Sequence, residues 1–317
     1  MKKHNYGYYF NSVEVKDNVV MKTAKNDYGK TKINNEIKFY NYIISNNIHF
    51  PMPKLIFSDI DISSFQIEFL DKHQTMCDVF YDKSAEKSKH IENTKLINTV
   101  LTHINKLHSH ESIYVSKNEY LSELNIETNQ KVIDRYNATK WSNIDIISEI
   151  THVNGIKIHD VYYYIEKINK YLEPIVSNLN AYCFTLIHGD IHLGNIMIDG
   201  DGDIRFIDPR GYFGNMSLFG IKEYDLAKLI FGLSGYSVFD KMTISDIKIT
   251  NGNIEIPFIE NHLHIYESDF FSEYTKLLSL TIWLSNNSMY LDEQKKIYSL
   301  MISYYLCEVY LDNCSIS

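Results

Sequence analysis

The pattern of hydrophobic residues changes near residue 70, and this change constrains the fold more than any other feature of the sequence. Before it, apolar and β-branched residues gather in short runs at 12–15, 19–23, 54–58 and 65–70. After it, apolar residues recur at alternating spacings of three and four over long stretches. Short runs are typical of strands, whereas the second spacing gives one face of a helix. An α+β protein is therefore expected, with a small β-rich region followed by a larger helical one.

The first 72 residues are predicted to form a small antiparallel sheet with one helix. A tight turn at Lys16-Asp17-Asn18 joins the first two strands, and residues 59–64 join the last two. A helix over 32–45 is predicted between the two pairs, because its apolar residues share one face: Ile33, Ile37, Tyr40 and Ile44. Residues 1–72 are accordingly interpreted as an N-terminal lobe.

Residues 73–317 are predicted to form a helical C-terminal lobe. Two long stripes repeat at helical spacing, Leu96-Val100-Ile104-Leu107 and Val161-Ile165-Ile168-Leu172-Ile175-Leu179. Residues 274–284 and 297–309 are also strongly apolar and helical in pattern. The simplest interpretation of these stripes is core packing.

Composition argues against several classes of protein. The net charge of −9 disfavours a nucleic-acid binder, which usually presents a basic face. No apolar run approaches the ~18 residues of a membrane span, and the N-terminal residues lack the apolar stretch of a secretory signal. The four cysteines form no C-x-x-C pair, so a reduced, cytoplasmic setting is expected: Cys77, Cys183, Cys307 and Cys314.

The stretch from His188 to Asp208 carries the strongest chemical signal. Asp190 follows His188-Gly189, and Asn195 comes five positions after Asp190. Two short strands, 196–198 and 204–207, then flank an acidic glycine turn and lead to Asp208. Because a hairpin brings its two ends together, these three polar side chains should converge.

This set of groups suits phosphoryl transfer. One carboxylate can orient the attacking hydroxyl and accept its proton, while a carboxylate and an amide oxygen can hold Mg²⁺ against nucleotide phosphates. The alternative is structural: Asp190 and Asn195 would cap a loop, and Asp208 would begin the next turn.

The motif His188-Gly189-Asp190, with Asn195 and then Ile207-Asp208, resembles that of aminoglycoside phosphotransferases and their relatives, the choline, ethanolamine and fructosamine kinases. The resemblance implies a two-lobed protein-kinase-like fold that binds ATP, or GTP, together with Mg²⁺. It implies that Asp190 is the catalytic base, that Asn195 and Asp208 are the metal ligands, and that His188 braces the loop. It also implies that Asp225, in Glu223-Tyr224-Asp225-Leu226-Ala227, is a structural buttress.

The N-terminal lobe offers the partners that such a fold requires. Lys22 ends a predicted strand and Glu36 lies on the following helix, in the order expected for a phosphate-binding lysine and the glutamate that holds it. Glu68 and Leu70 close the last strand, where backbone groups would bind the adenine edge. Leu70 and Ile207 would enclose the ring, although an ordinary strand end is an equal alternative.

Two features depart from the family pattern. No G-x-G-x-x-G precedes Lys22, and Gly7 is the only glycine in the first 28 residues, so phosphate cover would come from a polar loop near Asn11 and Ser12. Pro209 and Arg210 follow Asp208, a variant similar to phosphotransferase-like proteins of bacterial surface-polysaccharide loci. Arg210 would recognise an anionic acceptor or form a salt bridge within the catalytic loop.

Two further signals have simpler explanations. The acids between Asp199 and Asp203 do not satisfy an EF-hand loop and are interpreted as a solvated hairpin turn. His108 and His110 end a helix, where the dipole favours such residues.

The sequence thus predicts a kinase that phosphorylates a hydroxyl of a small molecule: a sugar, a polyol, an amino alcohol or an aminoglycoside-like compound. A protein kinase of the same fold and a non-catalytic nucleotide-binding module are the alternatives. No Ala-Pro-Glu segment follows Asp208, which disfavours the first of these. The presence of Lys22, Asp190, Asn195 and Asp208 argues against the second.

Overall fold

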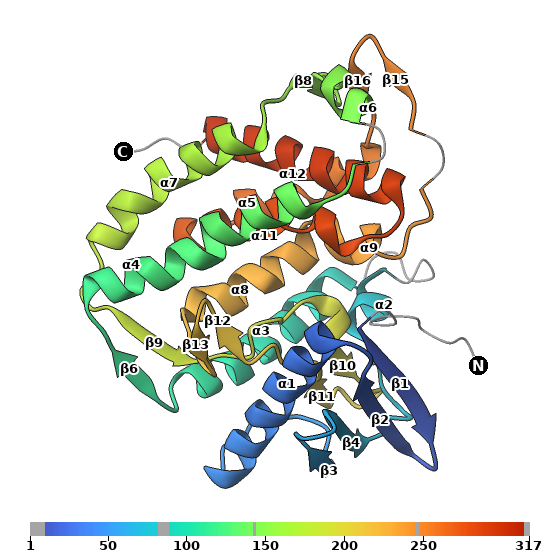
Figure 1. The fold of residues 1–317 in the computed structure, drawn as a ribbon, viewed down its shortest axis with the longest axis vertical. Coiled ribbons are helices and arrows are strands. Elements are labelled where there is room, and N and C mark those ends of the chain that lie inside the picture. The colour runs from blue at the N-terminus through green and yellow to red at the C-terminus, as the bar shows by residue number, and fades with distance from the viewer. Residues whose placement is uncertain (1–9, 82–88, 142–143, 245–246, 314–317) are drawn as a thin grey trace. The chain divides into compact units, whose positions relative to one another are not determined.

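A computed structural model describes residues 10–81, 89–141, 144–244 and 247–313, so Gly7 and Cys314 lie outside the described residues. The chain divides into two compact units (Figure 1). The first contains residues 1–113 and 184–225, and the second contains residues 114–183 and 226–317. The His188–Asp208 stretch therefore shares a unit with the N-terminal residues. The lobe boundary between residues 72 and 73 stays a prediction.

A four-stranded antiparallel sheet forms the start of the first unit. Its strands, β1 (Asn11–Lys16), β2 (Val19–Ala24), β3 (Leu55–Asp59) and β4 (Ser64–Glu68), pair in the order β1-β2-β4-β3. The turn between β1 and β2 places Asp17 and Asn18 at φ 51° and 61°. Two successive left-handed residues are what a two-residue hairpin of matching twist requires. All four predicted strands are confirmed.

Helix α1 (Asp27–Ser45) contacts this sheet (Figure 1). It begins five residues before the predicted start, because Asn26 caps it by accepting a hydrogen bond from the Gly29 N–H at 2.8 Å. Ile33 and Ile37 are fully buried, as the stripe predicted. Ile44, the last member of that stripe, is 57% exposed, and the neighbouring Ile43 is buried in its place.

The rest of the first unit connects this sheet to the motif. Strands β10 (Ile196–Ile198) and β11 (Ile204–Phe206) form a hairpin that pairs along its full length, and β5 (Gln74–Thr75) pairs with the other edge of β10. The elements are β5 (Gln74–Thr75), α2 (Met76–Tyr81), α3 (Lys89–His108), β6 (Ser112–Tyr114), β9 (Cys183–Leu186), η2 (Leu193–Asn195), β10 (Ile196–Ile198), β11 (Ile204–Phe206), β12 (Tyr212–Phe213), β13 (Met216–Ser217), β14 (Phe219–Gly220) and the first turn of α8 (Lys222–Phe231).

The second unit is mainly helical, as predicted. Trp283, Tyr164, Leu278 and Leu300 are fully buried in it. Its elements are α4 (Lys117–Asn125), η1 (Ile126–Gln130), α5 (Lys131–Ala138), α6 (Ile144–Glu149), β7 (His152–Val153), β8 (Ile156–Lys157), α7 (Val161–Ser177), the rest of α8, η3 (Gly232–Tyr236), α9 (Ser237–Phe239), β15 (Ile249–Thr250), β16 (Asn253–Ile254), η4 (Pro257–His262), α10 (His264–Glu267), α11 (Glu273–Leu284), η5 (Asn287–Met289) and α12 (Glu293–Asn313).

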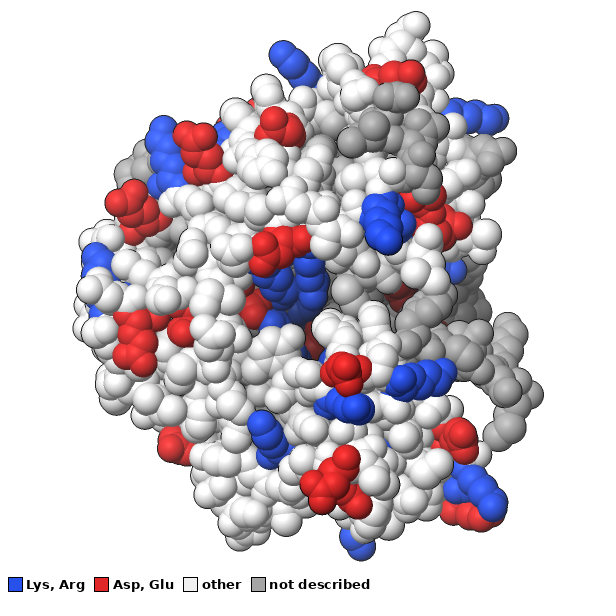
Figure 2. All heavy atoms as spheres, viewed as in Figure 1, with Lys and Arg blue, Asp and Glu red and all other residues white. Residues whose placement is uncertain are grey.

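The surface carries charges of both signs. Figure 2 shows Lys and Arg side chains interspersed with Asp and Glu over the face in view. Among the helices that the structure describes, none has the length and apolar character needed to cross a bilayer. Cys77, Cys183 and Cys307 are free thiols.

Candidate active site

Lys22 and Glu36 form a buried ion pair in the first unit. Lys22 Nζ, from β2, lies 2.9 Å from Glu36 Oε2, on α1. The two residues are only 7% and 8% exposed. The same ammonium group contacts the carboxylate of Asp208, 186 positions further along the chain. The structure therefore brings together three of the residues that the sequence singled out.

The surroundings of this cluster keep the lysine charged. Burial alone would lower the pKa of Lys22, but the carboxylates of Asp208 and Glu36 raise it above its ordinary value. Burial raises the pKa of Glu36 to about 7, although Lys22 opposes that rise. Two carboxylates thus share one buried ammonium group, although the side chain of Asp208 is 44% exposed.

A fully buried carboxylate holds the loop that begins at His188. Asp225, in the first turn of α8, accepts hydrogen bonds from His188 N at 3.0 Å and Gly189 N at 2.6 Å. His108 Nε2 lies 3.0 Å from the same carboxylate. A carboxylate with no exposed surface needs several donors to remain charged. These contacts confirm that Asp225 supports the loop.

The His188 ring is enclosed by aromatic side chains. Its centroid lies 6.0, 6.3 and 6.2 Å from those of Phe39, Phe50 and Phe206, respectively. Burial lowers the pKa of His188, against the opposing effect of the Asp225 carboxylate, which favours a neutral imidazole. Its Nδ1 accepts a hydrogen bond from the Asp190 N–H at 3.3 Å. His188 therefore braces the backbone of the residue proposed as the base.

Asn195 links Asp190 to the hairpin. Its Nδ2 donates to the Asp190 carbonyl oxygen at 3.0 Å and lies 3.3 Å from Asp190 Oδ2. After β11, Ile207 N donates to the Asn195 carbonyl oxygen at 3.0 Å. Asp208 is the next residue, so the hairpin returns the chain to the loop, as its strand–turn–strand pattern predicted.

Asp208 and Asn195 have the donor atoms that a magnesium ion prefers. The side-chain nitrogen of Asn195, Nδ2, is used on Asp190, which leaves the side-chain oxygen, Oδ1, as the ligand atom. Asp208 adds a carboxylate, and it adopts the left-handed φ of 59°. That conformation costs an L-residue roughly 1–2 kcal/mol, and such strain gathers at functional positions. These residues fit Mg²⁺, and their role as its ligands remains a proposal.

The predicted hinge residues are less directly placed. Glu68 ends β4, and its Oε2 accepts a hydrogen bond from Lys54 N at 3.2 Å, away from the Lys22 cluster. A contribution of Glu68 to nucleotide binding would therefore come from its backbone. Leu70 follows the strand and Ile207 precedes Asp208, and both are half-buried. Their contact with a base stays a prediction.

Arg210 packs against the loop that begins at His188. Its Nη1 donates to the hydroxyl of Tyr224 at 2.7 Å, and its guanidinium carbon lies 3.8 Å from the centroid of the Tyr212 ring. The Arg210 N–H donates to the His188 carbonyl oxygen at 2.8 Å. Of its two predicted roles, recognition of an anion has no direct support in these contacts, and the contacts with Tyr212 and Tyr224 favour a bracing role.

Sequence reasoning missed the role of His108. It ends α3, as predicted, but it is only 6% exposed and bonds to Asp225. A signal was available, because His108 follows Ile104 by four positions and so continues the buried face of that helix. It also missed a cross-strand row, Val15–Val20–Ile67, which shares the face of the sheet with Lys22.

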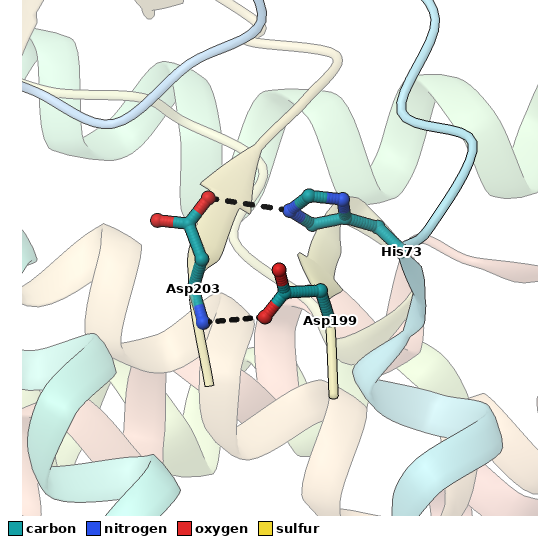
Figure 3. A group of neighbouring side chains, drawn as sticks. All are labelled: His73, Asp199 and Asp203. Atoms are coloured by element: carbon teal, nitrogen blue, oxygen red, sulfur yellow. Dashed lines mark hydrogen bonds and ion pairs between the residues drawn. The ribbon is translucent and has the colours of Figure 1, made fainter. Parts of the chain in front are cut away.

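A second polar cluster lies at the turn of the hairpin. Figure 3 shows His73, Asp199 and Asp203, whose ligand atoms all lie within 4.8 Å of one another. Each carboxylate already has protein partners: Asp199 accepts hydrogen bonds from Asp201 N and Asp203 N, and Asp203 contacts His73 and Arg205. These contacts explain why the three side chains lie close together: they stabilise the hairpin turn.

Comparisons with solved structures identify the fold. A glucosamine kinase matches with TM-score 0.53 and 10% identity over 93% of this chain and 73% of that one. Choline kinase LicA from Streptococcus pneumoniae matches with TM-score 0.52 and 12% identity over 95% and 90%. A glucosamine kinase complex with glucosamine, ADP and inorganic phosphate matches with TM-score 0.51 and 11% identity over 88% and 67%. No protein-family model and no curated protein sequence matches this chain.

The architecture agrees with what the His188–Asp208 motif implied. A small antiparallel sheet lies in the N-terminal region, and helices dominate towards the C-terminus. The chain therefore has the protein-kinase-like α+β fold of small-molecule kinases such as glucosamine kinase and choline kinase, which confirms the predicted resemblance at the level of the fold.

Proposed function

We propose that this protein transfers the γ-phosphoryl group of ATP to a hydroxyl group of a small molecule. The observation that carries the proposal is the convergence of Lys22, Glu36 and Asp208 beside the loop that holds Asp190 and Asn195. The solved kinases of the same fold support it, since one of them was obtained with glucosamine, ADP and inorganic phosphate. GTP is an alternative phosphoryl donor.

Asp190 is the proposed base. It would accept the proton of the attacking hydroxyl and orient that group towards the phosphorus. Its backbone is fixed by His188, and its carboxylate is oriented by the Asn195 amide. A base held in this way needs little reorganisation when the acceptor arrives.

Lys22 is the proposed phosphate-binding residue. Its charge is secured by Glu36, and its partner Asp208 is half-exposed, so the ammonium group can exchange one contact for a phosphate oxygen. Asn195 and Asp208 would hold Mg²⁺, which neutralises charge on the transferring phosphoryl group when bound.

The base of the nucleotide would lie against the sheet. Backbone groups of Glu68 and Leu70 would meet its edge, while Leu70 and Ile207 would contact its ring. The row Val15–Val20–Ile67 supports this arrangement, because its apolar side chains lie on the face of the sheet that carries Lys22.

The acceptor class is proposed as a sugar, polyol, amino alcohol or aminoglycoside-like compound. The solved relatives named for glucosamine and choline support a small acceptor over a protein or a nucleic acid. A cytoplasmic location is proposed with it, supported by the free thiols of Cys77, Cys183 and Cys307.

The test is ADP release from ATP and Mg²⁺ across a panel of such acceptors and one generic protein substrate. We expect turnover with a small hydroxyl compound, and a loss of about 10³-fold or more in Asp190→Ala with ATP affinity retained. Asp201→Asn, at the exposed hairpin turn, is the matched control and should keep full activity. Unchanged transfer in Asp190→Ala would remove Asp190 as the base. ATP binding without turnover on any acceptor would favour a non-catalytic module.

A further inference from the structure

Gly189, the residue before the proposed base, has a backbone that is restrained from outside. Its φ of 82° lies in the left-handed region that favours glycine. A Cβ built on Gly189 would lie 3.1 Å from Arg210 Cβ and 3.6 Å from Arg210 Cδ. The stem of Arg210 therefore fills the space that a side chain at Gly189 would occupy. Glycine is the most mobile residue in a chain, so a loose Gly189 would leave Asp190 loose as well.

The backbone N–H of Arg210 also restrains the carbonyl group of His188, which precedes Gly189. Arg210 N and Gly211 N both donate to the His188 carbonyl oxygen, at 2.8 and 3.2 Å. The His188–Gly189 peptide is thus held at its carbonyl oxygen by residues 210–211 and at its Gly189 N–H by Asp225, which also accepts the His188 N–H of the preceding peptide. Three chain segments meet at these two residues.

The guanidinium group completes a ring of contacts. Arg210 Nη1 donates a hydrogen bond to the Tyr224 hydroxyl, and Tyr224 directly precedes Asp225 in the chain. Asp225 accepts the Gly189 N–H, and Gly189 lies under the Arg210 stem. Tyr224 is 1% exposed and cannot easily shift, while the Tyr212 ring covers the guanidinium face. The planar guanidinium group of arginine can stack on a ring and donate a hydrogen bond at the same time, which the ammonium group of lysine cannot do.

We propose that Arg210 is a positioning residue that holds Asp190 in place through Gly189, by closing the ring Gly189–Arg210–Tyr224–Asp225. This inference rests on the proposed function, because it assigns Arg210 to orientation of the proposed base. It differs from recognition of an anionic acceptor, for which Arg210 would have to contact the substrate itself.

Kinetics separate the two roles. Tyr224→Phe removes only the hydroxyl that closes the ring, and Arg210→Lys keeps the charge but loses the fork. We expect each to lower kcat about 10-fold with the KM for acceptor and ATP unchanged, and Arg210→Ala to lower kcat about 100-fold. Arg205→Met, which removes an arginine from strand β11, is the matched control and should keep the kcat of the wild type. The proposal would be overturned if Tyr224→Phe kept the kcat of the wild type while Arg210→Lys raised the KM for the acceptor.

Amide hydrogen exchange provides a measurement that needs no activity. We expect the Gly189 N–H to exchange at least 10-fold faster in Arg210→Ala and Tyr224→Phe than in the wild type, with exchange in α12 unchanged. Unchanged exchange at Gly189 in both variants would overturn the ring. If the wild type transfers phosphoryl groups to no acceptor, the proposed function fails while the exchange result still decides whether Arg210 restrains Gly189.

Discussion

The β10–β11 hairpin carries acidic side chains at both of its ends, and the two ends differ in their partners. Asp208, after the second strand, and Asp203, at the turn, have nearly equal side-chain exposures of 44% and 45%. Asp208 contacts Lys22, whose side chain is 9% exposed, whereas Asp203 contacts Arg205, whose side chain is 36% exposed. The exposure of the acid does not distinguish the two clusters. The exposure of the lysine or arginine partner does, although His73, the second partner of Asp203, has a side chain that is only 11% exposed.

The contacts made by the lysine and by the arginine also differ in sequence separation. Arg205 and Asp203 are two positions apart, so their contact lies within the turn, although His73 also contacts Asp203 from 130 positions away. Lys22 and Asp208 are 186 positions apart, and their contact joins a strand of the sheet to the end of the hairpin. A solvated local pair contributes little free energy, whereas a buried cluster of groups that face a shared point can bind a charged ligand.

The largest expected difference between the two ends is catalytic. Asp208→Asn keeps the size of the side chain but removes the charge, and we expect kcat to fall by about 10³-fold or more. Asp199→Asn makes the same change at the turn, where an amide oxygen can still accept the two backbone hydrogen bonds, so kcat should change less than about threefold. Steady-state kinetics of the two variants would measure this, and equal losses would show that the turn cluster takes part in the reaction.

The next difference concerns the cationic partners. Lys22→Met should raise the Kd for ATP about 100-fold, which corresponds to roughly 2.7 kcal/mol, because the buried ammonium group is the proposed phosphate contact. Arg205→Met should leave the Kd within about twofold, since its partner is the exposed Asp203. Isothermal titration with ATP checks both variants. An unchanged Kd in Lys22→Met would move the phosphate site elsewhere.

The smallest expected difference is that Glu36 and Asp203 change the free energy of unfolding in opposite directions as pH rises. Burial raises the folded-state pKa of Glu36 from its ordinary value of 4.5 to about 7, so the folded state binds a proton more tightly than the unfolded state. The contribution of Glu36 to the free energy of unfolding therefore falls as pH rises from about 4.5 to 7, by at most about 3 kcal/mol. Glu36→Gln should accordingly gain stability relative to the wild type between pH 5 and pH 8.

The turn cluster should show the opposite trend. Burial tends to raise the pKa of Asp203, but Arg205 and His73 lower it below its ordinary value. Its stabilising contribution is therefore present at neutral pH and is lost as the solution becomes acidic. Urea denaturation of Glu36→Gln and Asp203→Asn at pH 3.5, 5 and 8 measures both trends. Parallel pH profiles for the two variants would contradict the contrast between the clusters.

Features set by local pattern were predictable from the sequence. The four strands, the turn at Asp17-Asn18 and the hairpin before Asp208 follow from runs of residues that determine their own conformation. The pairing of Lys22 with Glu36 was predictable only as an order of elements, because a register and a crossover decide whether two side chains meet. The start of α1 was missed because its cap, Asn26, precedes the apolar stripe.

Features set by tertiary contact could not be predicted. The bond between His108 and Asp225 joins residues 117 positions apart, and nothing local to either residue specifies the other. The position of Arg210 over Gly189 is of the same kind, because it depends on where β12 and α8 place two tyrosines. Family resemblance supplied roles for single residues, whereas the ring of contacts around Gly189 appears only in three dimensions.

The left-handed backbone at Asp208 limits how this position can vary over evolutionary time. Aspartate and asparagine enter that region more readily than other residues with side chains, and Pro209 keeps the preceding residue out of the right-handed helical conformation. Glycine would preserve the shape without a charge, and glutamate would preserve the charge without the shape. A lineage that abandoned the chemistry while keeping the architecture should therefore drift first to asparagine or glycine here, which makes this codon a marker of lost activity.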